Sequence, residues 1–355
     1  MSVDPIIGWD IGGAHLKAAR LGGTGVIEDV IQLPCPLWQG MDHLDRALRE
    51  AESRLGRAPR HAVTMTGEMV DLFPTRAAGV ARLAEAMERR LSGAEVRFFA
   101  GEDGFVDATA AAASPMRVAS ANWLASAALV AARTDAALLA DIGSTTVDLV
   151  VVRDGRVGAE GRDDAERLVS GELVYTGVVR TPVMALAERV PFDGQWVPLM
   201  AEYFATAADV YRLTEELPEC ADQHPAADGG EKTVEASARR LARMIGRDAG
   251  SAPPSAWREL ALWLGEAQLR RVGDACDRLF SLGVLPDRAP VVGAGVGRFL
   301  AAKIAATRGR PFVPFASLVE APPGLVDAVS NCAPAVAVAW LGFTTPAASS
   351  PPPAK

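Results

Sequence analysis

Two stretches that begin in the same way decide the fold: DIGGAHLK at residues 10–17 and DIGSTTVD at residues 141–148. Each follows an apolar run and leads into a second run of β-prone residues. Each therefore predicts a strand, a tight glycine-bearing turn and another strand, with an aspartate at the end of the first strand. Because the stretches open similar halves of the chain, we expect a duplicated α/β fold that grips a phosphorylated ligand between its halves.

The glycine-rich turns predict a phosphate site, since backbone N–H groups approach phosphate oxygens there without a side chain in the way. Strand-end carboxylates suit Mg²⁺, which prefers oxygen ligands, so Asp10 and Asp141 are the predicted metal ligands, facing each other across a cleft. Lys17 is placed to neutralise a phosphate charge. Ordinary β-turns are the alternative for either stretch alone. The predicted phosphate-binding residues of these turns are Gly12, Gly13, Gly143, Ser144, Thr145 and Thr146.

A third glycine-rich stretch, GAGVG at residues 293–297, follows an apolar run late in the chain. Its spacing is loosely that of a dinucleotide fingerprint, but no βαβ unit with a downstream acidic residue surrounds it. We expect Gly293, Gly295 and Gly297 to form a turn beneath an adenine or to close the far side of the cleft. The sequence leaves open whether ATP or ADP binds.

The segment SGELVYTGVVRTP at residues 170–182 is dense in polar side chains and follows soon after the second turn. Glu172 and Arg180 are predicted to line the cleft, with Arg180 suited to a bidentate phosphate contact. A surface helix ending at Thr-Pro is the alternative. Further along, the basic stretch RRLARMIGRD at residues 239–248 places arginines four apart on one helix face. These arginines either attract an anionic substrate or form a salt-bridged exposed face.

Composition narrows the class of protein. The chain has 355 residues and a net charge of −8, which is long enough for two domains and lacks the basic footprint of a nucleic-acid binder. The four scattered cysteines predict reduced thiols in the cytoplasm. The start of the chain shows no signal peptide, and the alanine-rich stretch at residues 119–140 is too broken by polar residues to span a membrane. We therefore expect a cytoplasmic protein with no nucleic-acid or membrane partner; a homo-oligomer stays open.

The pattern of elements predicts a first lobe at residues 1–135 and a second lobe at 136–324. A mostly helical insertion is expected at about 165–285 of the second lobe. The segment at 325–342 is apolar almost all round, so it is predicted to be one buried helix that packs back on the first lobe. The tail at 344–355 is rich in Pro, Ala and Ser and is expected to be disordered.

The two Asp-x-Gly turns, the late G-x-G-x-G and the buried terminal helix together resemble the actin-like ATPase superfamily, which includes sugar kinases, heat-shock ATPases and actin. The resemblance covers nearly the whole chain. It implies a duplicated, ribonuclease H-like fold with two lobes around a phosphate-binding cleft. The stretch at residues 141–148 is similar to the hydantoinase A/oxoprolinase branch of this superfamily.

A narrower resemblance rests on four motifs: MTGEM at 65–69, Asn122-Trp123, the segment at 171–182 and RLARMIGRD at 240–248. They are similar to the tetrahydromethanopterin-linked one-carbon transfer proteins of methylotrophs. The archaeal relatives of that family are synthases that couple an aminomethylfuran diphosphate to a tyramine phenol in methanofuran biosynthesis. The resemblance implies a transferase of methylofuran biosynthesis, in which a phenol oxygen displaces diphosphate from a furylmethyl carbon.

The resemblance also implies roles for residues. Mg²⁺ on the strand-end aspartates would neutralise the leaving diphosphate, helped by Lys17 and Arg180. Glu68 or Glu172 would take the proton of the phenol. The implied partners are a small-molecule diphosphate and a tyrosine- or tyramine-type phenol. An ATP-dependent small-molecule kinase or hydrolase of the same superfamily is the alternative.

Overall fold

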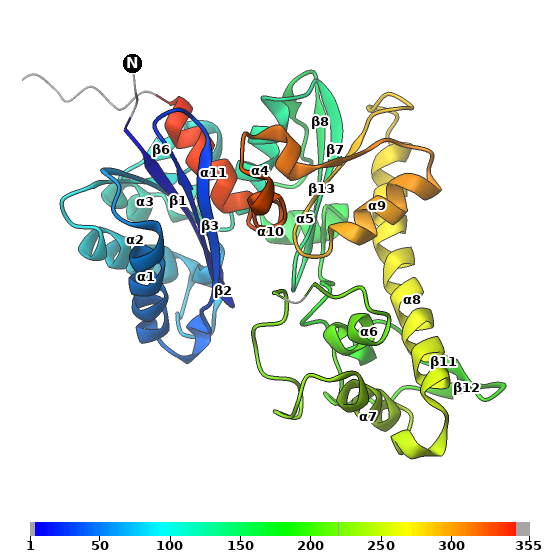
Figure 1. Cartoon of the computed structure of the whole chain (residues 1–355). Coiled ribbons are helices and arrows are strands. Elements are labelled where there is room, and N and C mark those ends of the chain that lie inside the picture. The colour runs from blue at the N-terminus through cyan, green and yellow to red at the C-terminus, as the bar shows by residue number, and fades with distance from the viewer. Residues whose placement is uncertain (1–3, 219, 346–355) are drawn as a thin grey trace, which may run out of the picture. The chain divides into compact units, whose positions relative to one another are not determined.

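A computed structural model describes residues 4–218 and 220–345 (Figure 1). The chain divides into two compact units. Unit 1 comprises residues 1–129 together with 316–355, and unit 2 comprises the continuous segment 130–315. Each unit has a mixed sheet and a hydrophobic core of its own.

Unit 1 is built on a sheet with the strand order β3-β2-β1-β4-β5-β6. Strand β1 pairs antiparallel with β2 and parallel with β4. Alternate β1 residues Ile7, Trp9 and Ile11 belong to the core that α1 and α2 cover, which leaves Gly8 and Asp10 on the other face. The strands are β1 (Ile6–Ile11), β2 (His15–Leu21), β3 (Ile27–Pro34), β4 (Arg60–Met65), β5 (Glu95–Phe99) and β6 (Phe105–Val106). The helices are α1 (Met41–Leu55), α2 (Arg76–Arg90), α3 (Ala108–Ala113), α4 (Asn122–Ala131), α10 (Val326–Asn331) and α11 (Ala333–Thr344).

The terminal helix expected at residues 325–342 is broken, which corrects the prediction of one continuous helix. Helices α10 and α11 meet at a bend of 102° around Cys332. Pro334 in the first turn of α11 explains the break, because proline lacks an N–H and its ring collides with the preceding turn of a helix. Thr344 still belongs to α11, and residues 346–355 of the predicted tail lie outside the described residues.

Helix α11 lies across β1, β2 and β4 (Figure 1). Gly8 makes this close approach possible, since a Cβ atom there would overlap Ala335 O and lie 2.6 Å from Ala339 N. Within the described part of the chain, no single helix is long and apolar enough to cross a membrane. Residues 323–331 and α11 together are long and apolar enough, but they form a bent pair and not a single helix.

Unit 2 repeats the central pairing of unit 1. Its sheet has the order β10-β8-β7-β13-β14, with β7 antiparallel to β8 and parallel to β13. An antiparallel hairpin whose first strand pairs in parallel with a later strand thus occurs in both units, as the duplicated α/β fold predicts. The strands are β7 (Ala136–Ile142), β8 (Val147–Arg153), β9 (Arg156–Val157), β10 (Leu173–Val174), β11 (Arg189–Phe192), β12 (Gln195–Pro198), β13 (Val291–Ala294) and β14 (Phe312–Pro314). The helices are α5 (Asp164–Ser170), α6 (Ala207–Leu213), α7 (Val234–Met244), α8 (Pro254–Ser281) and α9 (Arg298–Thr307).

The region expected as a mostly helical insertion contains most of α5 and all of α6, α7 and α8, and it also holds the β11–β12 hairpin. Helix α8 joins two hydrophobic cores. Leu260 and Leu264 belong to the core of the insertion, whereas Val272 and Cys276 belong to the core beside the sheet. The long helix therefore fixes the insertion to the sheet of the same unit.

The basic stretch at residues 239–248 begins on α7 and runs past the end of that helix at Met244, so Arg247 does not share the helix face of Arg239 and Arg243 that the sequence predicts. The stretch is an ion-paired framework rather than an open anion-binding face. Arg240 is fully buried, and it donates to Asp209 at 2.8 Å and to Asp228 at 3.1 Å. Arg243 also pairs with Asp228, at 3.5 Å, and Arg247 pairs with Asp193 at 3.7 Å. The salt-bridged alternative from the sequence describes these arginines better than the substrate-attracting one.

The buried pair of Trp9 and His61 predicts a pH dependence of stability. Trp9 Nε1 donates to His61 Nδ1 at 3.0 Å, and burial lowers the pKa of His61 from 6.5 to about 4. As the pH falls, His61 is therefore protonated in the unfolded chain before it is protonated in the folded protein. The contribution of neutral His61 to the free energy of unfolding is complete above pH 6.5 and is lost toward pH 4. We expect a loss of about 3 kcal/mol in the free energy of unfolding across that window. Urea unfolding of the wild type and of His61→Gln at pH 6.5 and at pH 4 measures this loss. An equal loss of unfolding free energy in the two proteins would contradict the assignment.

Candidate functional site

The turn at residues 143–146 joins β7 to β8, and we call it the cradle. Gly143 N donates to Thr146 O at 2.8 Å, which closes the turn. The backbone N–H groups of the next three residues, Ser144, Thr145 and Thr146, have no hydrogen-bond acceptor among the described residues, and the three residues are partly exposed. These N–H groups, with the hydroxyl groups of the same residues beside them, are available to an anion such as a phosphate oxygen. That this turn binds phosphate stays a prediction.

A second stretch of unit 2, residues 176–181, lies behind the cradle, and we call it the backing segment. Val178 N donates to Gly143 O at 3.1 Å, and Arg180 N donates to Ser144 O at 2.9 Å. The carbonyl oxygens of the cradle are thereby tied to the backing segment, while its amides stay available. The same bonds bring Arg180, a predicted phosphate contact, next to the cradle.

Gly177 allows this packing, because a Cβ atom there would overlap the backbone of Ser144 and Thr145. We expect Gly177→Ala to displace the cradle and to lower the free energy of unfolding by about 1–3 kcal/mol, the usual cost of overpacking. Gly250→Ala is the matched control, since a Cβ atom there meets nothing within 4 Å. Chemical unfolding measures both, and equal stabilities would show that the cradle adjusts without cost.

The late glycine stretch lies beside the same strand end. Ala294 on β13 is the register partner of Asp141 on β7. Gly295 has φ +79°, and a Cβ atom there would lie 2.6 Å from Asp141 Oδ1. Gly297 N donates to Ile142 O at 2.8 Å. Unit 2 thus gathers Asp141, the cradle, Arg180 and the third glycine turn in one place.

The first turn has the corresponding position in unit 1. Gly12 N donates to His15 O at 2.9 Å and closes the turn between β1 and β2. Asp10 is 4% exposed and faces Lys17 across the hairpin, with 3.9 Å between Lys17 Nζ and Asp10 Oδ2. Gly13 lies in the same turn, where Leu37 N donates to its carbonyl oxygen at 3.0 Å. The ammonium group and the strand-end carboxylate are thus neighbours.

Glu68 follows β4 at the same end of the sheet. Thr66 N donates to Ile11 O at 2.9 Å, which attaches this loop to the first turn. Glu68 Oε1 accepts from Ser120 Oγ at 3.0 Å and from Arg76 at 3.1 Å, whereas Oε2 is buried and accepts no hydrogen bond from the described residues. Burial raises the pKa of Glu68 above its usual value, although Arg76 and Ser120 oppose the rise. A buried carboxyl with a raised pKa is a frequent property of general bases.

Glu172 has a different environment. Its Oε1 accepts from Glu160 N at 2.8 Å, and its Oε2 accepts from Gly161 N and from Ser170 Oγ, each at 2.7 Å. The side chain is fully buried. Both oxygens therefore hold a loop in place, and Glu172 resembles a structural anchor more than a proton acceptor.

The structure groups the predicted residues by unit. Unit 1 holds Asp10, Lys17 and Glu68 near one turn, and unit 2 holds Asp141 and Arg180 near the other. That Asp10 and Asp141 share one pocket stays a prediction, because they belong to different units. Sequence reasoning missed Gln268, which contacts the backing segment, and Thr181, whose hydroxyl group makes hydrogen bonds within that segment. The signal for Gln268 was present: it occupies the four-residue repeat of the buried stripe Leu260, Leu264, Val272 and Cys276.

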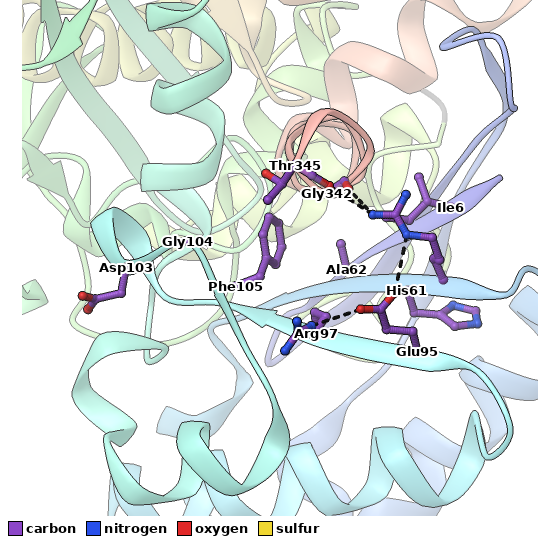
Figure 2. A pocket seen from close by; sticks show the side chains of 11 residues that line it. Ile6, His61, Ala62, Glu95, Arg97, Asp103, Gly104, Phe105, Gly342 and Thr345 are labelled. Carbon is purple, nitrogen blue, oxygen red and sulfur yellow. Dashed lines mark hydrogen bonds and ion pairs between the residues drawn. The ribbon is translucent and has the colours of Figure 1, made fainter. Parts of the chain in front are cut away.

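Unit 1 also has a cavity of about 260 Å³, which lies at the opposite ends of the parallel strands from Asp10. Figure 2 shows the side chains that line it. The cavity is lined by Ile6, the first residue of β1, and by charged residues from β4 and β5. Arg60 donates to Gly342 O at 2.6 Å and pairs with Glu95 at 3.6 Å, and Arg97 donates to Glu95 at 3.2 Å. The charges of this cavity thus fasten the end of α11 to the sheet.

Two synthases from archaea are similar to this chain. A synthase from Methanocaldococcus jannaschii, named (4-{4-[2-(gamma-L-glutamylamino)ethyl]phenoxymethyl}furan-2-yl)methanamine synthase, is 32% identical over 244 residues, which cover 68% of this chain and 72% of the relative. A protein of the same name from Methanococcus vannielii is 31% identical over 111 residues, which cover 31% of this chain and 50% of that protein.

Among solved structures, the nucleotide-free structure of acetone carboxylase aligns with a TM-score of 0.57 at 10% identity, covering 94% of this chain and 70% of that one. This likeness concerns the fold alone, and it agrees with the expected actin-like ATPase fold, which is confirmed. The profile of the hydantoinase/oxoprolinase family matches residues 60–328, more than half of the 355 residues. The chain belongs to the hydantoinase/oxoprolinase family.

Proposed function

We propose that the chain is a transferase that couples a furylmethyl diphosphate to a phenolic acceptor and releases diphosphate. The product named for the Methanocaldococcus jannaschii relative contains a phenoxymethyl–furan ether, which is the bond that such a coupling makes. The single observation in this chain that carries the proposal is the cradle, whose consecutive N–H groups at residues 144–146 present an anion site.

Diphosphate is the group that unit 2 is suited to hold. The amides and hydroxyl groups of the cradle bind its oxygens, and Arg180 adds a positive charge. Lys17 beside Asp10 supplies a further cation in unit 1. Because a furan ring stabilises positive charge on the adjacent carbon, stabilising the departing anion is the main task of the protein.

The oxygen groups near the cradle fit a magnesium ion. Among residues 4–218 and 220–345, no group of three or more His, Cys, Asp or Glu side chains gathers at one point. Mg²⁺ is commonly held by one or two carboxylates together with water and phosphate oxygens, and the Asp141 carboxylate, on the strand that leads into the cradle, would provide such a ligand. Asp141 or Asp10 would hold the ion, and when bound it would supply charge neutralisation for the diphosphate. ATP or ADP at the same cradle belongs to the alternative activity.

Glu68 is the proposed general base. Its buried Oε2 accepts no hydrogen bond from the described residues, whereas both oxygens of Glu172 are engaged by loop donors. In the reaction, the phenol oxygen forms a bond to the furylmethyl carbon as the bond from that carbon to the diphosphate oxygen breaks. The phenol proton passes to the Glu68 carboxylate, and the electron pair of the broken bond leaves with diphosphate. Charge and atoms balance without a redox partner.

We further place the reaction in methylofuran biosynthesis, in support of tetrahydromethanopterin-linked one-carbon metabolism in the cytoplasm. The support is the motif resemblance at residues 65–69, 171–182 and 240–248, together with the names of the relatives. The acceptor is a tyrosine- or tyramine-type phenol in this proposal.

The experiment incubates the full chain with an aminomethylfuran diphosphate, tyramine and Mg²⁺. Pyrophosphate release that depends on the phenol, with the ether found by mass spectrometry, is the expected result. A parallel reaction contains ATP and Mg²⁺ in place of the diphosphate. Steady ADP release, or phosphate transfer to a small acceptor without ether formation, would favour the kinase or hydrolase alternative and overturn the coupling proposal.

A further inference from the structure

We infer that Gln268 is a positioning residue for the cradle, although it lies on α8, far along the chain from residues 143–146. The inference rests on the proposed function only for the identity of the anion that the cradle binds. Gln268 is 1% exposed, and its amide is the point at which α8 meets the backing segment.

The hydrogen bonds of Gln268 assign the orientation of its side chain. Its Nε2 donates to Thr176 Oγ1 at 2.7 Å and to Gly177 O at 3.0 Å. Its Oε1 accepts from the hydroxyl group of Tyr211 on α6 at 2.7 Å. Burial raises the pKa of that hydroxyl, so Tyr211 remains a donor over the working pH range. The side chain has one arrangement that satisfies all three partners.

The backing segment connects Gln268 to the cradle through hydrogen bonds and packing. Gly177 N donates to Thr181 Oγ1 at 2.7 Å, and Thr181 Oγ1 donates in turn to Gly177 O at 2.9 Å. The same segment packs on the backbone of Ser144 and Thr145 and donates to the carbonyl oxygens of Gly143 and Ser144. The contacts from Gln268 through Gly177 to the cradle are therefore direct.

The place of Gln268 on α8 explains why a polar residue occurs there. It lies between Leu264, in the core of the insertion, and Val272, in the core beside the sheet. A leucine at this position would continue the apolar stripe of the helix but would leave Thr176 Oγ1 without its donor. Gln268 thus couples the packing of the helical insertion to the geometry of the anion site.

Gln268→Glu is the decisive variant, since it keeps the size and the acceptor for Tyr211 but places a carboxylate oxygen against Gly177 O. We expect its affinity for inorganic pyrophosphate with Mg²⁺, measured by calorimetry, to fall on the order of 10-fold or more at pH 8. The KM for the furylmethyl diphosphate should rise while the KM for the phenol stays constant. Affinity should recover as the pH is lowered, because the protonated carboxyl group can again donate to Gly177 O. A merely structural role would lower the fraction of folded protein and leave the pyrophosphate affinity of the folded fraction unchanged.

Two further variants keep the test decisive if Gln268→Glu folds poorly. Tyr211→Phe removes one hydroxyl group and should give a smaller change in the same direction, and Gln195→Glu on the exposed β12 strand is the matched charge control. Hydrogen–deuterium exchange of peptides that cover residues 143–146 and 176–181 should rise in Gln268→Glu and in Tyr211→Phe, but not in the control.

The outcomes separate this inference from the proposed function. Unchanged exchange at residues 143–146 and 176–181, with wild-type pyrophosphate affinity, would overturn the role of Gln268. Faster exchange in Gln268→Glu supports that role even when the wild type fails to couple a furylmethyl diphosphate to a phenol, a failure that would overturn the proposed function alone.

Discussion

Replacing Asp141 with asparagine is expected to lower kcat for diphosphate displacement on the order of 100-fold or more. The carboxylate lies at the end of β7, where Gly295 packs against its Oδ1 and the cradle begins two residues later. Asparagine keeps the shape of the side chain, so the loss reflects charge rather than packing. Pyrophosphate release at saturating phenol measures the effect.

Asp154→Asn provides the control, because Asp154 is an exposed residue of the turn after β8 and has a left-handed φ of +53° that asparagine tolerates. Both variants should unfold at the same urea concentration as the wild type. Full turnover by Asp141→Asn would show that the Asp141 carboxylate takes no part in the reaction. The cradle would then act with other charged groups.

Replacing Glu68 with glutamine is expected to produce opposite effects on activity and stability. Loss of the proton acceptor should reduce kcat by roughly 10²–10⁴-fold, with little change in the KM for the diphosphate. Because the folded pKa of Glu68 is raised, stability in the wild type falls as the pH rises from the unfolded pKa through the folded one. Glutamine has no charge to bury, so the free energy of unfolding at pH 7 should increase. Pyrophosphate release and urea unfolding are measured on the same preparation.

Glu172→Gln is the matched comparison. An amide group at this position turns one acceptor into a donor that faces the N–H groups of Glu160 and Gly161, so this variant should lower the free energy of unfolding. The contrast distinguishes the two carboxylates that the sequence alone left as equal choices for the base. A stable, inactive Glu172→Gln together with an active Glu68→Gln would reverse the assignment.

The sequence predicted the parts of the fold that depend on local pattern. The Asp-x-Gly stretches required glycine at the turns and β-prone residues on both sides, so the hairpins at residues 10–17 and 141–148 followed from short-range rules. The parallel partners of the first strands of these hairpins, β4 and β13, are distant in sequence, so no local pattern predicted these pairings, although the two similar stretches predicted a duplicated fold.

Other features depended on contacts that no local pattern reveals. The break at Cys332 was missed because the apolar run continues through it, although Pro334 was a visible reason for a new helix. The sequence placed Arg240 in a basic stretch that was expected either to attract an anionic substrate or to form an exposed, salt-bridged face. Arg240 is buried because it pairs with Asp209, which lies 31 residues earlier in the chain. Gln268 escaped notice for the same reason, since its partners on the backing segment lie about ninety residues away.

The discontinuous course of unit 1 has a consequence for biosynthesis. Unit 2 is a single segment, so all of its residues are translated before α11. The sheet of unit 1 is completed later. Helix α11, which packs on Gly8 through Ala335 and Ala339, is translated only after unit 2. During that interval the sheet of unit 1 lacks the helix α11 that covers one of its faces. The order of synthesis therefore favours folding of unit 2 before unit 1 is complete.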